Sequence, residues 1–147
     1  MINWMKEAEK YKDEMIRDLE GLISIPSLRN DEEACEGAPF GKGPREALDY
    51  MLKLGEDNGF KTQDVDGYAG VITYGDGEES IGVLGHLDIV PIGEDWTKDP
   101  LKCTQENGYL FGRGVLDDKG PAMAGFYAMK MLRDNNVPIS QKIMLIL

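Results

Sequence analysis

Residues 81–88 read Ile-Gly-Val-Leu-Gly-His-Leu-Asp, an apolar run that ends in a glycine, the only histidine of the chain and an aspartate. The apolar part predicts a buried strand, so His86 and Asp88 lie where that strand ends. Further along, Asp117 and Asp118 precede an apolar helix. Imidazole and carboxylate groups at a strand end and a helix start are a common way to build a metal site in an α/β protein.

Apolar periodicity around this stretch predicts the remaining elements. Helices are expected at residues 3–23, from Pro44 to Asn58-Gly59, and from Lys119 or Pro121 to Arg133. Strands are expected at 60–65, 68–74, 80–84, 109–111 and 142–147, with a hairpin-like turn at Gly75-Asp76-Gly77 and irregular chain over 91–108. Alternating apolar strands and helices predict an α/β fold, a mostly parallel or mixed sheet covered by helices.

Composition limits the partners and the compartment. A length of 147 residues suits one domain, and a net charge of -11 is a poor match to nucleic acid or anionic membranes. The N-terminus has no signal-peptide pattern, and no apolar run approaches the roughly twenty residues that span a bilayer. Cys35 and Cys103 form no metal-binding pair, which predicts reduced thiols in a cytoplasmic protein.

Each polar residue of the suspected site also has a structural explanation. A lone histidine is usually a surface or structural residue, although Asp88 lies close enough in sequence to hold the His86 ring in one tautomer, as carboxylates beside zinc ligands do. Aspartate before a helix often caps it, which could explain Asp117 or Asp118. Two adjacent carboxylates repel each other unless a cation is near, and Arg113, Lys119 or a divalent metal could serve.

Two motifs, GHLDIVP at 85–91 and GRGVLDDKGP at 112–121, closely resemble the N-terminal motifs of the zinc aminoacylase/carboxypeptidase superfamily of metallopeptidases. The wider match resembles its bacterial Xaa-His dipeptidase branch, which is carnosinase-like. Further matching pieces are 39–44, 47–51, 67–70 and 82–100. The resemblance therefore extends over nearly the whole chain in order.

The resemblance implies a site with two zinc ions, for which cobalt or manganese could substitute, and a small dipeptide as substrate. It places a metal ligand at His86, the metal-bridging carboxylate at Asp117, and the histidine-orienting, catalytic aspartate at Asp88. Asp118 matches a variable position. Gly85, Gly112, Gly114 and Gly120 match backbone positions that let the loops approach the metals. The family's general base is a glutamate of a Glu-Glu pair that follows a strand resembling 142–147.

By this resemblance, residues 1–147 correspond to the N-terminal portion of the catalytic domain, without its C-terminal part and without the lid domain. We therefore expect zinc-dependent dipeptide hydrolysis from the full-length parent, and an inactive chain with weak zinc binding from these residues alone. Another amide hydrolase of the superfamily, a deacetylase or aminoacylase, stays open.

Parts of the sequence are also compatible with two other classes of protein. One is a non-catalytic fragment that self-associates through an exposed C-terminal strand at 142–147. The other is a nucleotide-binding domain, which ranks low because acidic residues follow Gly112-Arg113-Gly114 and no G-x-x-x-x-G-K-[ST] motif is present.

Overall fold

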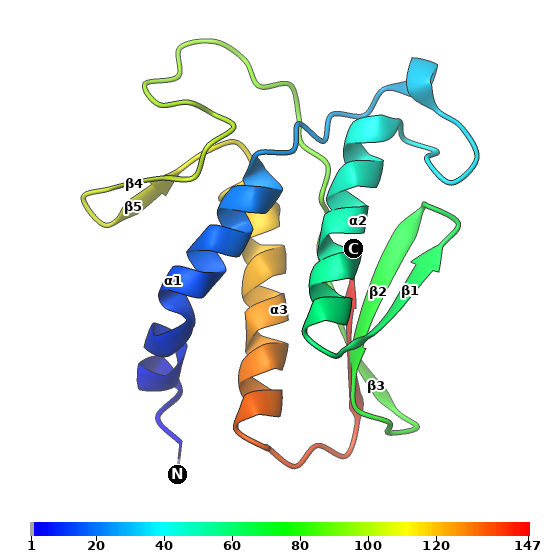
Figure 1. Cartoon of the computed structure of the whole chain (residues 1–147), viewed down its shortest axis with the longest axis vertical. Coiled ribbons are helices and arrows are strands. Elements are labelled where there is room, and N and C mark those ends of the chain that lie inside the picture. Colours follow the sequence, from blue (N-terminus) through cyan, green and yellow to red (C-terminus); the bar gives the residue numbers. More distant parts are fainter. Residues whose placement is uncertain (1) are drawn as a thin grey trace.

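The computed structural model describes residues 2–147, in which three helices pack together and two of them lie against a four-stranded sheet (Figure 1). The helices are α1 (Trp4–Ile23), α2 (Lys42–Asp57) and α3 (Lys119–Asp134). Ile72 and Leu145 are cross-strand partners on one face of the sheet, where Ile72 meets Gly55 of α2 and Leu145 meets Gly125 of α3. Helix α1 packs chiefly on α3. The predicted α/β fold with a mixed sheet is confirmed.

The sheet has the strand order β1-β2-β6-β3. Its strands are β1 (Lys61–Val65), β2 (Ala69–Tyr74), β3 (Ser80–Leu84) and β6 (Lys142–Ile146). Strand β6 is parallel to β3 and antiparallel to β2, and β1 is antiparallel to β2. The connection from β3 to β6 runs through α3 and is the crossover that parallel strands require.

Two expectations about the sheet are wrong. The turn at Gly75-Asp76-Gly77 does not join a hairpin, because β6 lies between β2 and β3. The C-terminal strand is not an exposed edge, because β6 pairs on both sides, and β1 and β3 form the edges instead. The physical reason is that β6 is the most apolar strand and gains most from a central position, where both its edges are hydrogen-bonded.

The helices begin and end where local signals place them. Asn3 caps α1, since its side chain accepts the backbone N–H of Lys6 at 3.2 Å. Helix α2 starts two residues before Pro44, which lies in its first turn, and is followed by Asn58 and by Gly59 at φ +75°. Fully buried core side chains come from all three helices and from the sheet, and they include Leu22, Met51, Ile72, Phe126 and Leu145.

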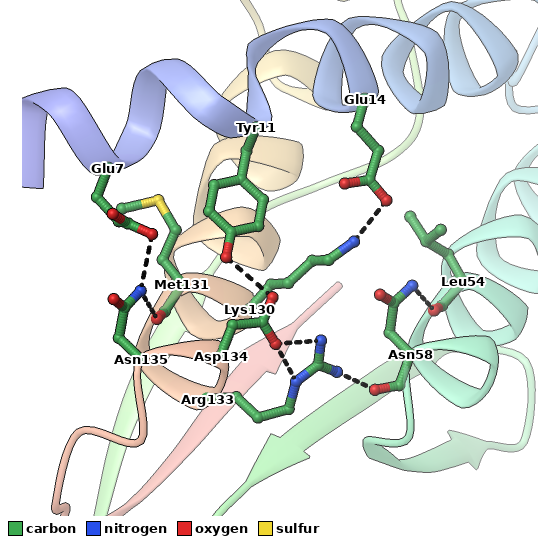
Figure 2. A network of polar contacts seen from close by, with 10 residues as sticks. All are labelled: Glu7, Tyr11, Glu14, Leu54, Asn58, Lys130, Met131, Arg133, Asp134 and Asn135. Atoms are coloured by element: carbon green, nitrogen blue, oxygen red, sulfur yellow. Dashed lines mark hydrogen bonds and ion pairs between the residues drawn. The ribbon is translucent and has the colours of Figure 1, made fainter.

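A polar network holds α1 to α3 and to the end of α2 (Figure 2). The Tyr11 hydroxyl donates to Asp134 at 2.9 Å, and the Lys130 ammonium donates to Glu14 at 2.6 Å. The Arg133 guanidinium donates to the Asn58 carbonyl beyond the last turn of α2. These contacts hold the C-terminal end of α3 to α1 and to the end of α2, so the three helices pack together as one layer.

The segment 91–108, expected to be irregular, contains a strand that sequence reasoning missed and that pairs with the strand predicted at 109–111. Strands β4 (Thr104–Glu106) and β5 (Tyr109–Phe111) pair across Asn107-Gly108, both of which have positive φ. An Asn-Gly pair between short strands is the usual signal of such a turn, but polar Gln105 and Glu106 hide the strand pattern. A short 3-10 helix (Asp31–Glu33) also lies in the loop after α1.

Within residues 2–147, no helix combines the length and the apolar character that a membrane crossing would need. Both cysteines are free, Cys35 on the surface and Cys103 in the core.

Candidate metal centre

The candidate site lies where β3 ends and α3 begins. The backbone N–H of Gly85 donates to the Ile146 carbonyl at 3.0 Å and extends the parallel ladder up to His86. Asp117 and Asp118 come just before α3, whose N-cap is Asp118. The two motifs that lie apart in the sequence therefore meet at the carboxyl end of a parallel strand pair, the edge at which α/β proteins commonly place their sites.

The His86 ring lies between two carboxylates. Its Nε2 atom is 3.0 Å from Oδ1 of Asp117, and its Nδ1 atom is 3.2 Å from Oδ1 of Asp88. A proton on Nδ1 that is donated to Asp88 leaves the Nε2 lone pair on the side of Asp117. This is the arrangement by which a carboxylate orients a histidine ligand, so the structure brings together the three residues singled out from the sequence.

Opposing effects act on the pKa of His86. Partial burial lowers it, whereas the hydrogen bond to Asp117 and the negative charge of Asp88 raise it. Together the two carboxylates outweigh burial, and the pKa of His86 lies above its ordinary value. The environment of this imidazole thus favours positive charge, as expected where a cation binds.

Asp118 does not cap α3 with its side chain, although it occupies the N-cap position. Its carboxylate instead accepts the backbone N–H of His86 at 3.1 Å. The peptide bond between Asp117 and Asp118 is cis. The capping explanation therefore fails for Asp118, which connects the start of α3 to the strand end that carries His86. Sequence reasoning missed this contact, and no local signal marks it.

The cations that could have balanced the aspartate pair face away from it. Lys119 is fully buried, and its ammonium donates to the carbonyls of Leu22 and Ile25 at the end of α1. Arg113 donates to the Ile92 carbonyl and lies over the Trp96 ring, 5.1 Å from its centroid. Within residues 2–147, no lysine or arginine forms an ion pair with Asp117 or Asp118. Neither Lys119 nor Arg113 therefore balances the charge of this carboxylate pair.

Two glycines shape the turn that carries Asp117. Gly114 has φ +92°, a left-handed conformation that side chains rarely adopt. A Cβ atom on Gly120 would lie 1.9 Å from the Val115 carbonyl oxygen, so no larger residue fits without moving the backbone. Both positions therefore require glycine, and the expected approach of these loops to metal ions stays a prediction.

The residues present supply only part of a metal site. His86 and Asp117 offer a nitrogen and an oxygen donor of the types that zinc binds. Residues 2–147 contain no group of three or more histidine, cysteine, aspartate or glutamate side chains arranged to hold a metal ion. Since zinc takes about four ligands, this pair fits the chemistry of a ligand set but does not complete one.

Comparison with known proteins shows which family this arrangement is similar to. A family model described as "Peptidase family M20/M25/M40" matches residues 82–147, which hold both motifs. The Bacillus subtilis protein named "Putative dipeptidase YtjP" is 43% identical over 146 residues, covering 99% of this chain and 32% of that protein. The chain is related to the M20 peptidases. The resemblance inferred from the two motifs is thereby confirmed, and the chain spans about a third of the length of the curated relatives it matches.

Solved M20 structures share the fold. Human carnosine dipeptidase 1 superimposes with a TM-score of 0.74 at 22% identity, covering 94% of this chain and 32% of that one. The YXEP protein of Bacillus subtilis, described as a dinuclear metal binding peptidase from the M20 family, gives a TM-score of 0.60 at 16% identity, with 95% and 35% covered. At these identities the likeness concerns the fold, which matches the first third of both chains.

Proposed function

We propose that residues 1–147 form the N-terminal part of the catalytic domain of a two-metal dipeptidase. The observation that carries the proposal is the pairing of His86 Nε2 with the Asp117 carboxylate at 3.0 Å, on the motifs that match the M20 peptidases. A nitrogen and an oxygen donor that meet at a strand end, with Asp88 behind the ring, are what a metal-dependent hydrolase requires there.

In this proposal each residue has one role. His86 and Asp117 would hold metal through a ring nitrogen and a carboxylate, and Asp88 holds the His86 ring in the tautomer that leaves Nε2 free. The metal pair, when bound, would supply an activated water and a polarised peptide carbonyl. Asp118 fixes the His86 backbone, and buried Lys119 anchors the start of α3 to the end of α1.

The proposed substrate is a dipeptide, with Xaa-His dipeptides as the preferred class. The curated relatives named as dipeptidases support the coarser statement, and the resemblance to the Xaa-His branch supports the finer one. Few side chains in residues 2–147 can coordinate a metal ion, so we expect residues 1–147 by themselves to bind zinc weakly and to be inactive.

The test uses the full-length protein that contains this chain. Purified protein is assayed against Xaa-His dipeptides, other dipeptides and N-acetyl amino acids, before and after removal and return of zinc. We expect dipeptide hydrolysis that a chelator abolishes and zinc restores. His86→Ala and Asp117→Asn should each lower kcat/KM at least a thousandfold, about 4 kcal/mol of transition-state stabilisation.

Asp95→Asn is the matched control, because Asp95 is an exposed aspartate in the loop after the first motif. Its activity should equal that of the unmodified protein. Full dipeptidase activity in His86→Ala would falsify the proposal, and hydrolysis of N-acetyl amino acids alone would replace the dipeptidase by a deacylase of the same family.

A further inference from the structure

We propose that Ser27 is a positioning residue that sets the orientation of His86 and Asp88 at the candidate metal centre. The inference rests on the proposed function, because it concerns how the residues of the same site are held. It starts from the loop after α1, which lies outside both sequence motifs. Ser27 is a polar residue of this loop, and it is 0% exposed.

The chain after β3 shows alternating burial. Leu87 and Ile89 are buried, whereas the side chains of His86 and Asp88 are half-exposed. This alternation is typical of extended backbone, in which successive side chains point to opposite sides. His86 and Asp88 therefore lie on one side of the segment, and their common direction depends on how the peptide groups between them are turned.

The loop after α1 runs beside this segment. Leu28 forms a parallel bridge with Ile89, and the Ile89 N–H donates to the Ser27 carbonyl at 3.1 Å. The Ser27 hydroxyl donates to the Leu87 carbonyl at 2.5 Å. Ser27 thus bonds on both sides of Asp88, to the preceding residue through its side chain and to the following residue through its backbone.

The Ser27 hydroxyl is the donor that pairs the Leu87 carbonyl. Within residues 2–147 no backbone N–H donates to this carbonyl, and Leu87 is buried. A buried acceptor without a donor is unfavourable, so the carbonyl would turn towards another donor or towards water if the hydroxyl were removed. Such a movement rotates the peptide group between Leu87 and Asp88.

This peptide group leads directly into the acceptors of the His86 ring. Nδ1 of His86 lies 3.2 Å from the Asp88 carboxylate and 3.2 Å from the Asp88 backbone carbonyl. Rotation of the preceding peptide group displaces both acceptors, and with them the Nε2 atom that lies 3.0 Å from Asp117. Ser27 therefore acts on the ring through the backbone of Asp88.

The start of α2 keeps Ser27 itself in place. A Cβ atom on Gly43 would lie 2.5 Å from the Pro26 carbonyl oxygen and 3.1 Å from Cα of Ser27. The backbones of the helix and the loop are therefore in close contact, and the loop cannot move towards α2. A polar group held by packing in this way is suited to fix the geometry of a neighbouring site.

The first test is a zinc competition titration of the full-length protein that contains this chain. Ser24→Ala is the matched control for Ser27→Ala, because the exposed Ser24 hydroxyl donates to the Gly21 carbonyl at 2.7 Å. Ile72→Val is a destabilised control, since it removes one carbon from a fully buried side chain of β2. We expect zinc affinity to fall about 10–100-fold in Ser27→Ala and to stay unchanged in both controls.

Turnover gives a further readout at saturating zinc. We expect kcat for a dipeptide to fall about tenfold in Ser27→Ala with little change in KM, because misplaced groups at the reacting centre affect turnover more than substrate binding. Both controls should keep the kcat and KM of the unmodified protein.

Nuclear magnetic resonance of isotope-labelled histidine reads the ring itself in the zinc-free protein. The signals of His86 are identified by their loss in His86→Ala, and they show which ring nitrogen carries the proton of the neutral imidazole. The unmodified protein should carry it on Nδ1, whereas Ser27→Ala should give a mixture of the two tautomers. A general loss of stability does not change the tautomer, and Ile72→Val should keep the proton on Nδ1.

Equal zinc affinity in Ser27→Ala and Ser24→Ala, or equal losses in Ser27→Ala and Ile72→Val, would overturn the role of Ser27 while leaving the proposed function intact. If Ser27→Ala does not fold, Ser27→Cys, with its weaker S–H donor, replaces it and is judged by the same outcomes. A full-length protein that binds no zinc would instead refute the proposed function. The tautomer of His86 then decides the role of Ser27, which an unchanged tautomer in Ser27→Ala would refute.

Discussion

At the scale of single residues, the orientation of His86 depends on Asp88. The two side chains are half-exposed and meet at 3.2 Å, and Nδ1 of His86 also lies 3.2 Å from the backbone carbonyl of Asp88. Asp88→Asn keeps the size of the side chain but removes the charge that stabilises a proton on Nδ1. We expect zinc affinity of the full-length protein to fall about 10–100-fold, the usual cost of losing a partner behind a histidine ligand.

A zinc competition titration measures this effect, with Asp95→Asn as the control that removes a charge nearby. An unchanged affinity in Asp88→Asn would mean that Asp88 does not orient the ring and that the backbone alone positions His86.

Lys119 shows how the same neighbourhood affects stability. Burial lowers the pKa of Lys119 to about 8, although the negative charge of Asp88 acts in the opposite direction, and the ordinary pKa of the side chain is 10.5. Between these values the unfolded chain binds more protons than the folded chain, so this side chain makes stability rise as the pH rises from about 8 towards 10.5. Below pH 8 both states are protonated and the contribution no longer changes.

The measurement is urea unfolding of the chain at pH 7.5 and 9.5, beside Lys119→Met. Relative to that variant, the unmodified chain should gain about 1–2 kcal/mol between the two pH values. Lys12→Met removes an exposed lysine of α1 and should reproduce the pH dependence of the unmodified chain. Parallel pH profiles in the chain and in Lys119→Met would show that burial does not shift this ammonium.

At the scale of elements, the turn before α3 is the most constrained piece of backbone. Gly120→Ala brings a Cβ atom against the Val115 carbonyl, and the turn must move to make room. We expect the chain to lose about 1–3 kcal/mol of stability by this overpacking, and zinc affinity of the full-length protein to fall because Asp117 moves with the turn. Gly82→Ala in β3 is the control, since the nearest atom to its Cβ would lie 3.7 Å away. Equal stability and zinc affinity in the two variants would contradict this account.

The elements also show what the sequence could and could not predict. The helices and the strands β1, β2, β3, β5 and β6 were predicted to within two residues, because caps, glycines and apolar periodicity are local signals. The insertion of β6 between β2 and β3 was missed, since strand pairing joins residues far apart in the chain. The contact of His86 with Asp88 was predictable, because the two residues are close in sequence. The hydrogen bond from the His86 backbone to Asp118 joins residues far apart in the chain and required the folded structure.

At the scale of the whole molecule, β6 joins the helical layer to the site. It is one of the two inner strands of the sheet, its Leu145 side chain is 0% exposed, and its Ile146 carbonyl accepts the Gly85 N–H just before His86. The candidate metal centre therefore depends on the packing of α3 against β6. The C-terminal strand lies inside the sheet and not at the exposed edge that the self-associating alternative required.

This dependence predicts the effect of a core truncation far from any metal ligand. Leu145→Ala opens a cavity between β6 and α3 and should cost about 2–5 kcal/mol of unfolding free energy, a large share of the stability of a domain this size. Leu116→Ala removes the same atoms from a side chain that is 88% exposed, next to Asp117, and should cost less than about 0.5 kcal/mol. Urea denaturation of both variants measures the difference. Similar losses of unfolding free energy in the two variants would contradict this account, because packing around Leu145 would then not hold the end of β3 and the start of α3 together.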